Sequence, residues 1–190
     1  MKQYLLVYDV VSSRNRTVLF HVDGHLVREA EFALELSISP EGRAEQAVSD
    51  WEASVEANTR EVLQGIDPAE LAAIGLTAQS EVCVLIGRDG RALMPSINWA
   101  DQRGGQVAAL PMDPARYQQL TAGNCGRNSA FSKLRWIKEH RPDLFAQTAK
   151  VLNCKDYFAY LLTGAAVTDR TDAGQIGSYD FARDTWSEEI

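Results

Sequence analysis

Hydrophobic and polar positions over the first third of the chain form short apolar runs separated by turn residues. The run from Tyr4 to Tyr8 is apolar and rich in β-forming residues, and it stops at Asp9. Thr17–Val22 and Leu26–Leu36 follow, separated by Asp23-Gly24, a dipeptide that readily takes the left-handed conformation of a hairpin turn. The pattern predicts three antiparallel strands at the start of the chain.

After Gly42 the period becomes helical. Apolar residues recur at helical spacing from Ala44 to Val62, with Trp51 on the inner face and Gly65 as the C-cap. Leu71–Thr77 is predicted to return to the sheet as a parallel strand. Two further segments are predicted to be extended and three helical: Val82–Ile86 and Leu93–Trp99, then Pro114–Thr121, Phe131–His140 and Cys154–Leu162. This order predicts an α/β fold of the actin-like ATPase, ribonuclease H-like type, with flanking helices; topology alone carries no function.

Composition and charge exclude several classes of protein. Hydrophobic residues make up 45% and charged residues 24%, which is typical of a soluble globular chain. No apolar run approaches the ~20 residues that span a membrane, and the N-terminus lacks a signal-peptide cleavage site, so we expect a cytoplasmic protein without a membrane partner. The net charge of -7 argues against nucleic acid as a partner. The three cysteines, Cys83, Cys125 and Cys154, have no metal-ligand spacing and are predicted to be reduced thiols.

The turn after the first strand is the first polar segment that could carry chemistry. Asp9 at a strand end, beside Ser12 and Ser13, could hold a hydrated Mg²⁺ and phosphate oxygens. Arg16 could add a positive charge for a transferring phosphate. The alternative is a turn whose polar groups bond only locally, and composition alone favours it.

Two later segments carry groups suited to sugar hydroxyls. Gln79 can donate and accept hydrogen bonds and Glu81 can accept them, at the end of a predicted buried strand; the alternative is a solvated loop. In the segment 98–103, the indole of Trp99 could cover the apolar face of a sugar while Asp101 binds its hydroxyls. The alternative there is a core Trp with an Asp–Arg pair, Asp101 and Arg103, on the surface.

A fourth segment, 155–174, is predicted to be architectural before it is catalytic. Asp156 could cap a helix, and Asp169 and Asp172 could organise a loop.

Together with the helix at Phe131, these segments resemble the FGGY carbohydrate kinases, in that family's order over nearly the whole chain. Asp9, Ser13 and Arg16 match its Asp-x-Gly-Thr-Ser/Thr-x-x-Arg phosphate motif, with Ser12 in place of Thr. The stretch 74–90 is similar to the strand that carries the family's sugar-contacting Gln. Residues 97–103 resemble its Trp-x-Asp-x-Arg segment, 133–138 its Lys-Leu-x-Trp-Leu helix, and 155–173 its Asp-Tyr, Leu-Thr-Gly and Thr-Asp run. One such match is weak, but five in order are strong.

The resemblance implies that residues 1–190 are a partial N-terminal, sugar-binding lobe of a kinase that uses ATP and Mg²⁺. The substrate would be a small sugar or polyol, xylulose-, gluconate- or glycerol-like, phosphorylated on one hydroxyl. Asp9 would position Mg²⁺, and Ser12, Ser13 and Arg16 would face the phosphates. The residues implied to line or support the sugar pocket are Gln79, Ser80, Glu81, Trp99, Asp101 and Arg103.

The same resemblance implies that two functional parts of the family are not among residues 1–190. The family's general-base Asp and its C-terminal ATP-binding lobe are expected beyond Ile190. We therefore assign no catalytic residue, expect the fold to be incomplete at its C-terminus, and expect the isolated chain to be inactive. A homodimer is one of the assemblies left open.

Two departures from the family pattern bear on function. Val11 stands where the family has a Gly, which would let backbone approach phosphate closely. A degenerate lobe that binds sugar without transferring phosphate is therefore the alternative function, and an inactive remnant is a third. Ser80-Glu81 matches neither the Met-His pair of xylulose kinases nor the Arg-Glu pair of glycerol kinases, so the substrate cannot be read from it.

Overall fold

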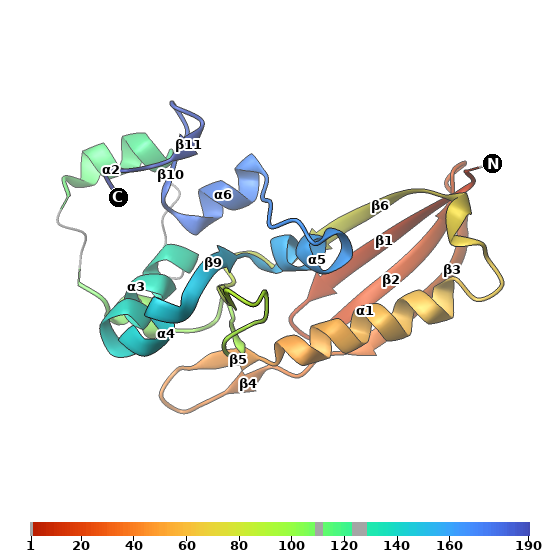
Figure 1. Cartoon of the computed structure of the whole chain (residues 1–190), viewed down its shortest axis with the longest axis horizontal. Coiled ribbons are helices and arrows are strands. Elements are labelled where there is room, and N and C mark those ends of the chain that lie inside the picture. Colours follow the sequence, from red (N-terminus) through yellow and green to blue (C-terminus); the bar gives the residue numbers. More distant parts are fainter. Residues whose placement is uncertain (1, 109–111, 123–128) are drawn as a thin grey trace. The chain divides into compact units, whose positions relative to one another are not determined.

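The computed structural model describes residues 2–108, 112–122 and 129–190. The chain divides into two compact units (Figure 1). The first unit comprises Met1–Leu36 and Gln46–Gln79, and the second comprises Ser37–Glu45 and Ser80–Ile190.

The first unit is built on a four-stranded sheet of order β3-β2-β1-β6. The strands β1 (Tyr4–Val11), β2 (Arg14–His21) and β3 (Leu26–Ala33) form an antiparallel meander, and β6 (Leu71–Ala78) joins β1 in parallel. This confirms the predicted opening meander and the returning parallel strand. Because Val10 on β1 pairs with Ala78 on β6, the carboxyl ends of these two strands lie side by side.

Helix α1 (Val48–Val62) runs along β2 and β3 of this sheet (Figure 1). Its buried stripe includes Trp51 and Val62, both 0% exposed, as the helical period predicted. The prediction that the helix starts at Ala44 was wrong, because residues 44–46 form β5 (Ala44–Gln46), which pairs with β4 (Ser37–Ile38). Cross-strand hydrogen bonding there overrides a local helical pattern. A short 3₁₀ turn, η1 (Pro68–Glu70), leads into β6.

The second unit combines two small sheets with short helices. Strand β7 (Val84–Gly87) pairs with β9 (Thr148–Leu152) in antiparallel fashion, and β4, β5 and β8 (Ser96–Ile97) form the other sheet. The remaining elements are η2 (Arg103–Gln106), α2 (Pro114–Thr121), α3 (Ala130–His140), α4 (Pro142–Gln147), α5 (Cys154–Thr163), α6 (Arg170–Ile176), β10 (Tyr179–Asp180) and β11 (Thr185–Trp186). The predicted helices α2, α3 and α5 are confirmed, whereas the strand predicted over Leu93–Trp99 shrinks to the two residues of β8.

The core of the second unit gathers around β7 and α3. Its buried apolar residues are Cys83, Leu85, Ile97, Ala130, Ile137 and Ile176. Cys83 and Cys154 are buried free thiols, as predicted, and Cys125 lies outside the described residues. Within the described ranges, no helix is long and apolar enough to cross a membrane.

Candidate functional site

The predicted phosphate segment lies in the first unit, at the turn between β1 and β2. The half-buried Asp9 carboxylate accepts no hydrogen bond from the described part of the chain, and Ser13 is exposed. The guanidinium of Arg16 is instead bound by Glu29 on β3, with Nε 3.1 Å from the carboxylate, and Glu31 lies 3.8 Å away. This arginine is therefore held by carboxylates in the present structure, and its predicted role toward phosphate stays a prediction.

Three polar side chains join the phosphate turn to the end of β6. The Ser12 hydroxyl donates to Gln79 Oε1 at 2.7 Å, and Gln79 Nε2 donates to Gln46 Oε1 at 2.6 Å. Gln46 Nε2 closes the ring by donating to the Ser12 carbonyl at 2.9 Å. The ring fixes which end of the Gln79 amide faces each neighbour, so two segments predicted separately form one polar cluster.

Sequence reasoning missed Gln46, which is 2% exposed. The residues from Ala44 onward were assigned to a helix, where a lone Gln carries no signal. A glutamine in a short strand just before a helix would have been the available clue.

Val11 ends β1 in the ordinary extended region. Among the described residues other than glycine, positive φ occurs at Glu81, Ala122 and Asp184, and not at position 11. The backbone there does not need the conformational freedom of glycine. The difference between Val11 and the glycine of the family pattern is therefore only the bulk of the side chain, which is 37% exposed.

The loop after β6 enters the second unit with Ser80 exposed and Glu81 in the left-handed region at φ 56°. The buried ammonium of Lys133 on α3 donates to the Glu81 carbonyl. Glu81 thus has a backbone conformation that is uncommon for a residue with a Cβ.

In the segment from Trp99 to Arg103, burial is the reverse of the alternative considered from the sequence, which was a core Trp with an Asp–Arg pair on the surface. Trp99 is 48% exposed, whereas Asp101 and Arg103 are 0% and 4% exposed. Asp101 Oδ2 accepts from the Ala44 amide at 2.8 Å and from Arg103 Nη2 at 2.7 Å, while Oδ1 accepts from Arg103 Nε at 2.9 Å. Arg103 also donates to Glu45 at 2.6 Å. The structure thus exposes the indole of Trp99 and buries the Asp101–Arg103 ion pair.

The 155–174 segment is architectural, as predicted. Asp156 forms a capping box with Asn153 at the start of α5, and Asp169 caps α6 by accepting from Thr171 at 2.8 Å. The Lys155 ammonium lies 3.1, 3.1 and 3.0 Å from the carboxylates of Asp156, Asp169 and Asp172. One cation therefore ties the starts of α5 and α6 together.

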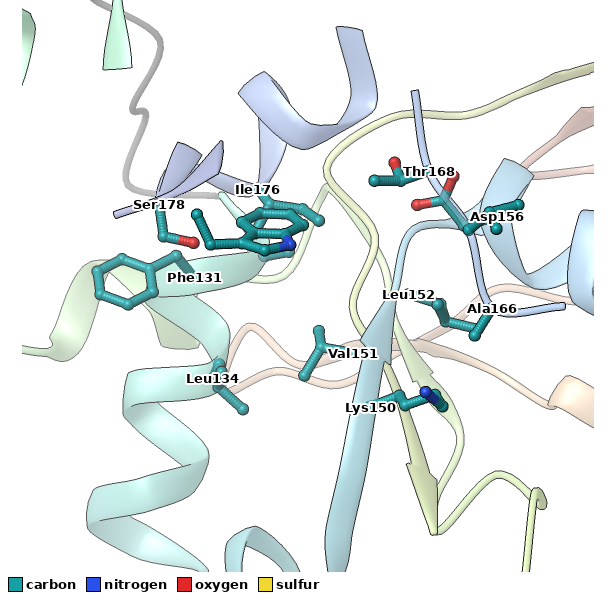
Figure 2. A pocket seen from close by; sticks show the side chains of 13 residues that line it. Phe131, Leu134, Lys150, Val151, Leu152, Asp156, Ala166, Thr168, Ile176 and Ser178 are labelled. Atoms are coloured by element: carbon teal, nitrogen blue, oxygen red, sulfur yellow. The ribbon is translucent and has the colours of Figure 1, made fainter. Parts of the chain in front are cut away.

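A pocket of about 430 Å³ lies elsewhere in the second unit. Figure 2 shows Phe131 and Leu134 of α3 on one side of it, with Asp156 and Thr168 on the other. None of the ten residues predicted to bind phosphate, metal or sugar lines this pocket. Its position gives no support to the predicted site.

Asp9 is the expected Mg²⁺ ligand, and its setting fits that ion. No group of three or more acidic, histidine or cysteine side chains able to hold a metal occurs in the described ranges. Mg²⁺ keeps several waters and usually takes one or two carboxylates together with substrate phosphates. A single carboxylate two residues before the end of β1, accepting no hydrogen bond from the described residues, meets that requirement.

Two buried groups in the second unit make stability depend on pH. Burial lowers the pKa of Lys133 from 10.5 to about 8, and burial raises the pKa of the Cys83 thiol from 9.0 to about 12. Above pH 8 the unfolded lysine keeps a proton that the folded one has lost, so the free energy of unfolding rises with pH. Above pH 9 the unfolded thiol loses a proton that the folded one keeps, which opposes the rise.

We therefore expect the free energy of unfolding to increase by roughly half a kcal/mol between pH 8 and pH 9, because the opposing contribution of the thiol offsets part of the lysine contribution of about 1 kcal/mol. Urea denaturation at the two pH values measures it. The variant Lys133→Met should abolish the increase, while Lys138→Met on the exposed side of α3 should retain it. An increase that survives Lys133→Met would assign the titration to another group.

Comparison with known proteins identifies relatives along the whole chain. Residues 4–190 match the profile of the FGGY family of carbohydrate kinases, N-terminal domain. A xylulose kinase of Bacillus subtilis is 26% identical over 192 residues, which are 99% of this chain and 38% of the relative. A glycerol kinase of Thermococcus gammatolerans is 25% identical over 200 residues, covering 100% of this chain and 40% of the relative.

Solved structures agree with the observed fold. The crystal structure of gluconate kinase from Lactobacillus acidophilus superposes with a TM-score of 0.88 at 27% identity, over 98% of this chain and 38% of that one. A xylulose kinase from Rhodospirillum rubrum gives 0.88 at 25% identity, over 99% and 40%. The predicted actin-like α/β fold is confirmed, and the chain spans about two fifths of the length of these relatives.

Proposed function

Because this chain belongs to the FGGY family of carbohydrate kinases, we propose that it forms the sugar-binding lobe of an ATP-dependent kinase acting on a small sugar or polyol. The observation that carries the proposal is the family match over residues 4–190. The relatives described above act, by their names, on xylulose, glycerol and gluconate. The reaction would transfer a phosphoryl group from ATP to one hydroxyl, which depends on positioning and charge neutralisation more than on covalent chemistry.

We propose residue roles for each of the two units separately. In the first unit, Asp9 would bind Mg²⁺, which neutralises phosphate charge when present, while Ser12 and Ser13 would donate to phosphate oxygens. Arg16 can serve the phosphates if it leaves Glu29, to which it is bound by an exposed and therefore weak ion pair. Gln79, fixed by the Ser12–Gln46 ring, stays a proposed sugar contact.

In the second unit, Trp99 would cover the apolar face of the sugar, and Ser80 and Glu81 would bind its hydroxyls. Asp101 and Arg103 would support Trp99 from below the surface, since their own polar atoms are bonded to one another and to residues 44 and 45. We propose a cytoplasmic location and MgATP as the second substrate. Because it spans 38–40% of its relatives' length, we propose that the 190-residue chain alone transfers no phosphate.

Calorimetric titration of the chain with D-xylulose, glycerol and D-gluconate tests the sugar-binding proposal. We expect saturable binding of at least one of them, with the other two as internal comparisons. A correctly folded chain that binds none of these compounds, and no other pentose, hexose or short polyol, would contradict it.

A degenerate lobe that binds sugar without phosphoryl transfer remains the second candidate. Val11 in place of glycine and the Arg16–Glu29 ion pair favour it. This alternative predicts that the protein at its natural length is inactive and that Val11→Gly restores turnover. Turnover by the wild type would eliminate it.

A further inference from the structure

Lys133 occupies an unusual position for a lysine. Its residue is 0% exposed on α3, on the same buried face as Ala130 and Ile137, while Lys138 of the same helix is exposed. A buried ammonium costs free energy unless a partner compensates it, and lysine is almost never fully buried without one. A lysine at this position therefore needs a specific contact to account for it.

The charged and titratable groups around the Lys133 ammonium leave it without a dedicated counter-ion. Cys83 keeps its proton because burial raises the pKa of its thiol to about 12. The Asp101 carboxylate is already paired with Arg103 at 2.7 Å. Glu81 contributes an electrostatic attraction, and the hydrogen bond from Lys133 goes to the backbone carbonyl of that residue.

Glu81 is the residue whose backbone most needs such a partner. Its φ of 56° lies in the left-handed region, where a side chain with a Cβ is disfavoured over glycine. Such strain persists where the surroundings over-determine the conformation. A charge-assisted hydrogen bond to the Glu81 carbonyl supplies that constraint from a helix 52 residues further along the chain.

We propose that Lys133 is a positioning residue, which holds Glu81 in the left-handed conformation and thereby sets the directions of the Ser80 and Glu81 side chains toward the sugar. The second half of this inference rests on the proposed function. Exchanging residues 80 and 81 would then change which hydroxyls are bound, while Lys133 keeps the frame in which they are presented.

The contact itself is tested without any sugar, by nuclear magnetic resonance on chain labelled with ¹³C at glutamate carbonyls. We expect the Glu81 carbonyl resonance to titrate with a midpoint near the Lys133 pKa of about 8. The titration should vanish in Lys133→Met and persist in Lys138→Met. A Glu81 carbonyl that does not respond to pH in the wild type overturns the proposal, and this measurement needs no variant to fold.

A rescue variant separates positioning from general stability. Because glycine adopts positive φ without steric cost, adding Lys133→Met to Glu81→Gly should move the amide shifts of Val82 and Cys83 less than Lys133→Met moves them in the wild type. Equal changes in the two backgrounds, or unchanged shifts in Lys133→Met alone, would show that Lys133 does not hold this backbone.

Affinity for the compound that the wild type binds, among D-xylulose, glycerol and D-gluconate, tests the link to function. We expect Lys133→Met to weaken that binding by about tenfold to a hundredfold, since small displacements of binding groups cost that much, and Lys138→Met to leave it unchanged. Wild-type affinity in a Lys133→Met chain whose carbonyl titration is lost would overturn the proposed positioning. If the wild type binds no sugar of the panel, the proposed function fails, and the carbonyl titration with the glycine rescue still decides whether Lys133 holds Glu81.

Discussion

Asp101→Ala should lower the free energy of unfolding of the chain by about 3–5 kcal/mol, because breaking a buried ion pair leaves the other charge uncompensated. The Arg103 guanidinium is 4% exposed and stacks 5.0 Å from the Trp136 ring, so it cannot move to water without disrupting its surroundings. The Ala44 amide would also lose its acceptor. Urea denaturation monitored by far-ultraviolet circular dichroism measures the loss.

Asp143→Ala is the matched control for this variant. Its carboxylate pairs with Arg141 at 3.2 Å, but both side chains are at least half exposed, so we expect a much smaller change in the free energy of unfolding. Equal effects of the two substitutions would contradict the supporting role given to Asp101. Equal effects would instead fit the surface Asp101–Arg103 pair that was the alternative from the sequence.

Trp99→Ala should weaken sugar binding by about thirtyfold, which is roughly 2 kcal/mol for the loss of an aromatic face and the apolar area that it covers. Stability should change by less than about 0.5 kcal/mol, because Trp99 is already 48% exposed and an exposed side chain contributes little to the core. Calorimetry with the sugar that the wild type binds measures the first effect, and urea denaturation the second.

Trp186→Ala provides a control of equal size in the same unit, since Trp186 is 47% exposed and lines the separate 430 Å³ pocket. Its sugar affinity should match that of the wild type. Loss of affinity in Trp186→Ala with full affinity in Trp99→Ala would move the sugar site to the pocket of Figure 2.

The strands and helices that carry their own local signal were predictable. The meander of β1, β2 and β3 follows from apolar runs and an Asp-Gly turn, and α2 begins and ends where Pro114 and Thr121 were expected. Strand β5 was not predictable, because its three residues are extended by pairing with β4 against a helical local pattern. Strand β9 is likewise defined by its partner β7.

The candidate site was predicted by segment but not by orientation. The order of the motifs identified both Trp99 and Asp101 as candidate site residues. The sequence does not tell which of two nearby residues faces water. The structure exposes the indole of Trp99 and buries the carboxylate of Asp101. Gln46 and Lys133 act through residues distant in sequence, Gln79 and Glu81, so no local spacing marks them. A lysine at helical spacing from Ile137 was the single clue to Lys133.

The most direct measurement is phosphoryl transfer by the protein at the length in which its own cell makes it, followed as ADP release with MgATP and D-xylulose, glycerol or D-gluconate. We expect ADP release that depends on one of these compounds, and no release from residues 1–190 alone. A folded protein of natural length that binds MgATP but releases no ADP with any of the panel would contradict the kinase assignment.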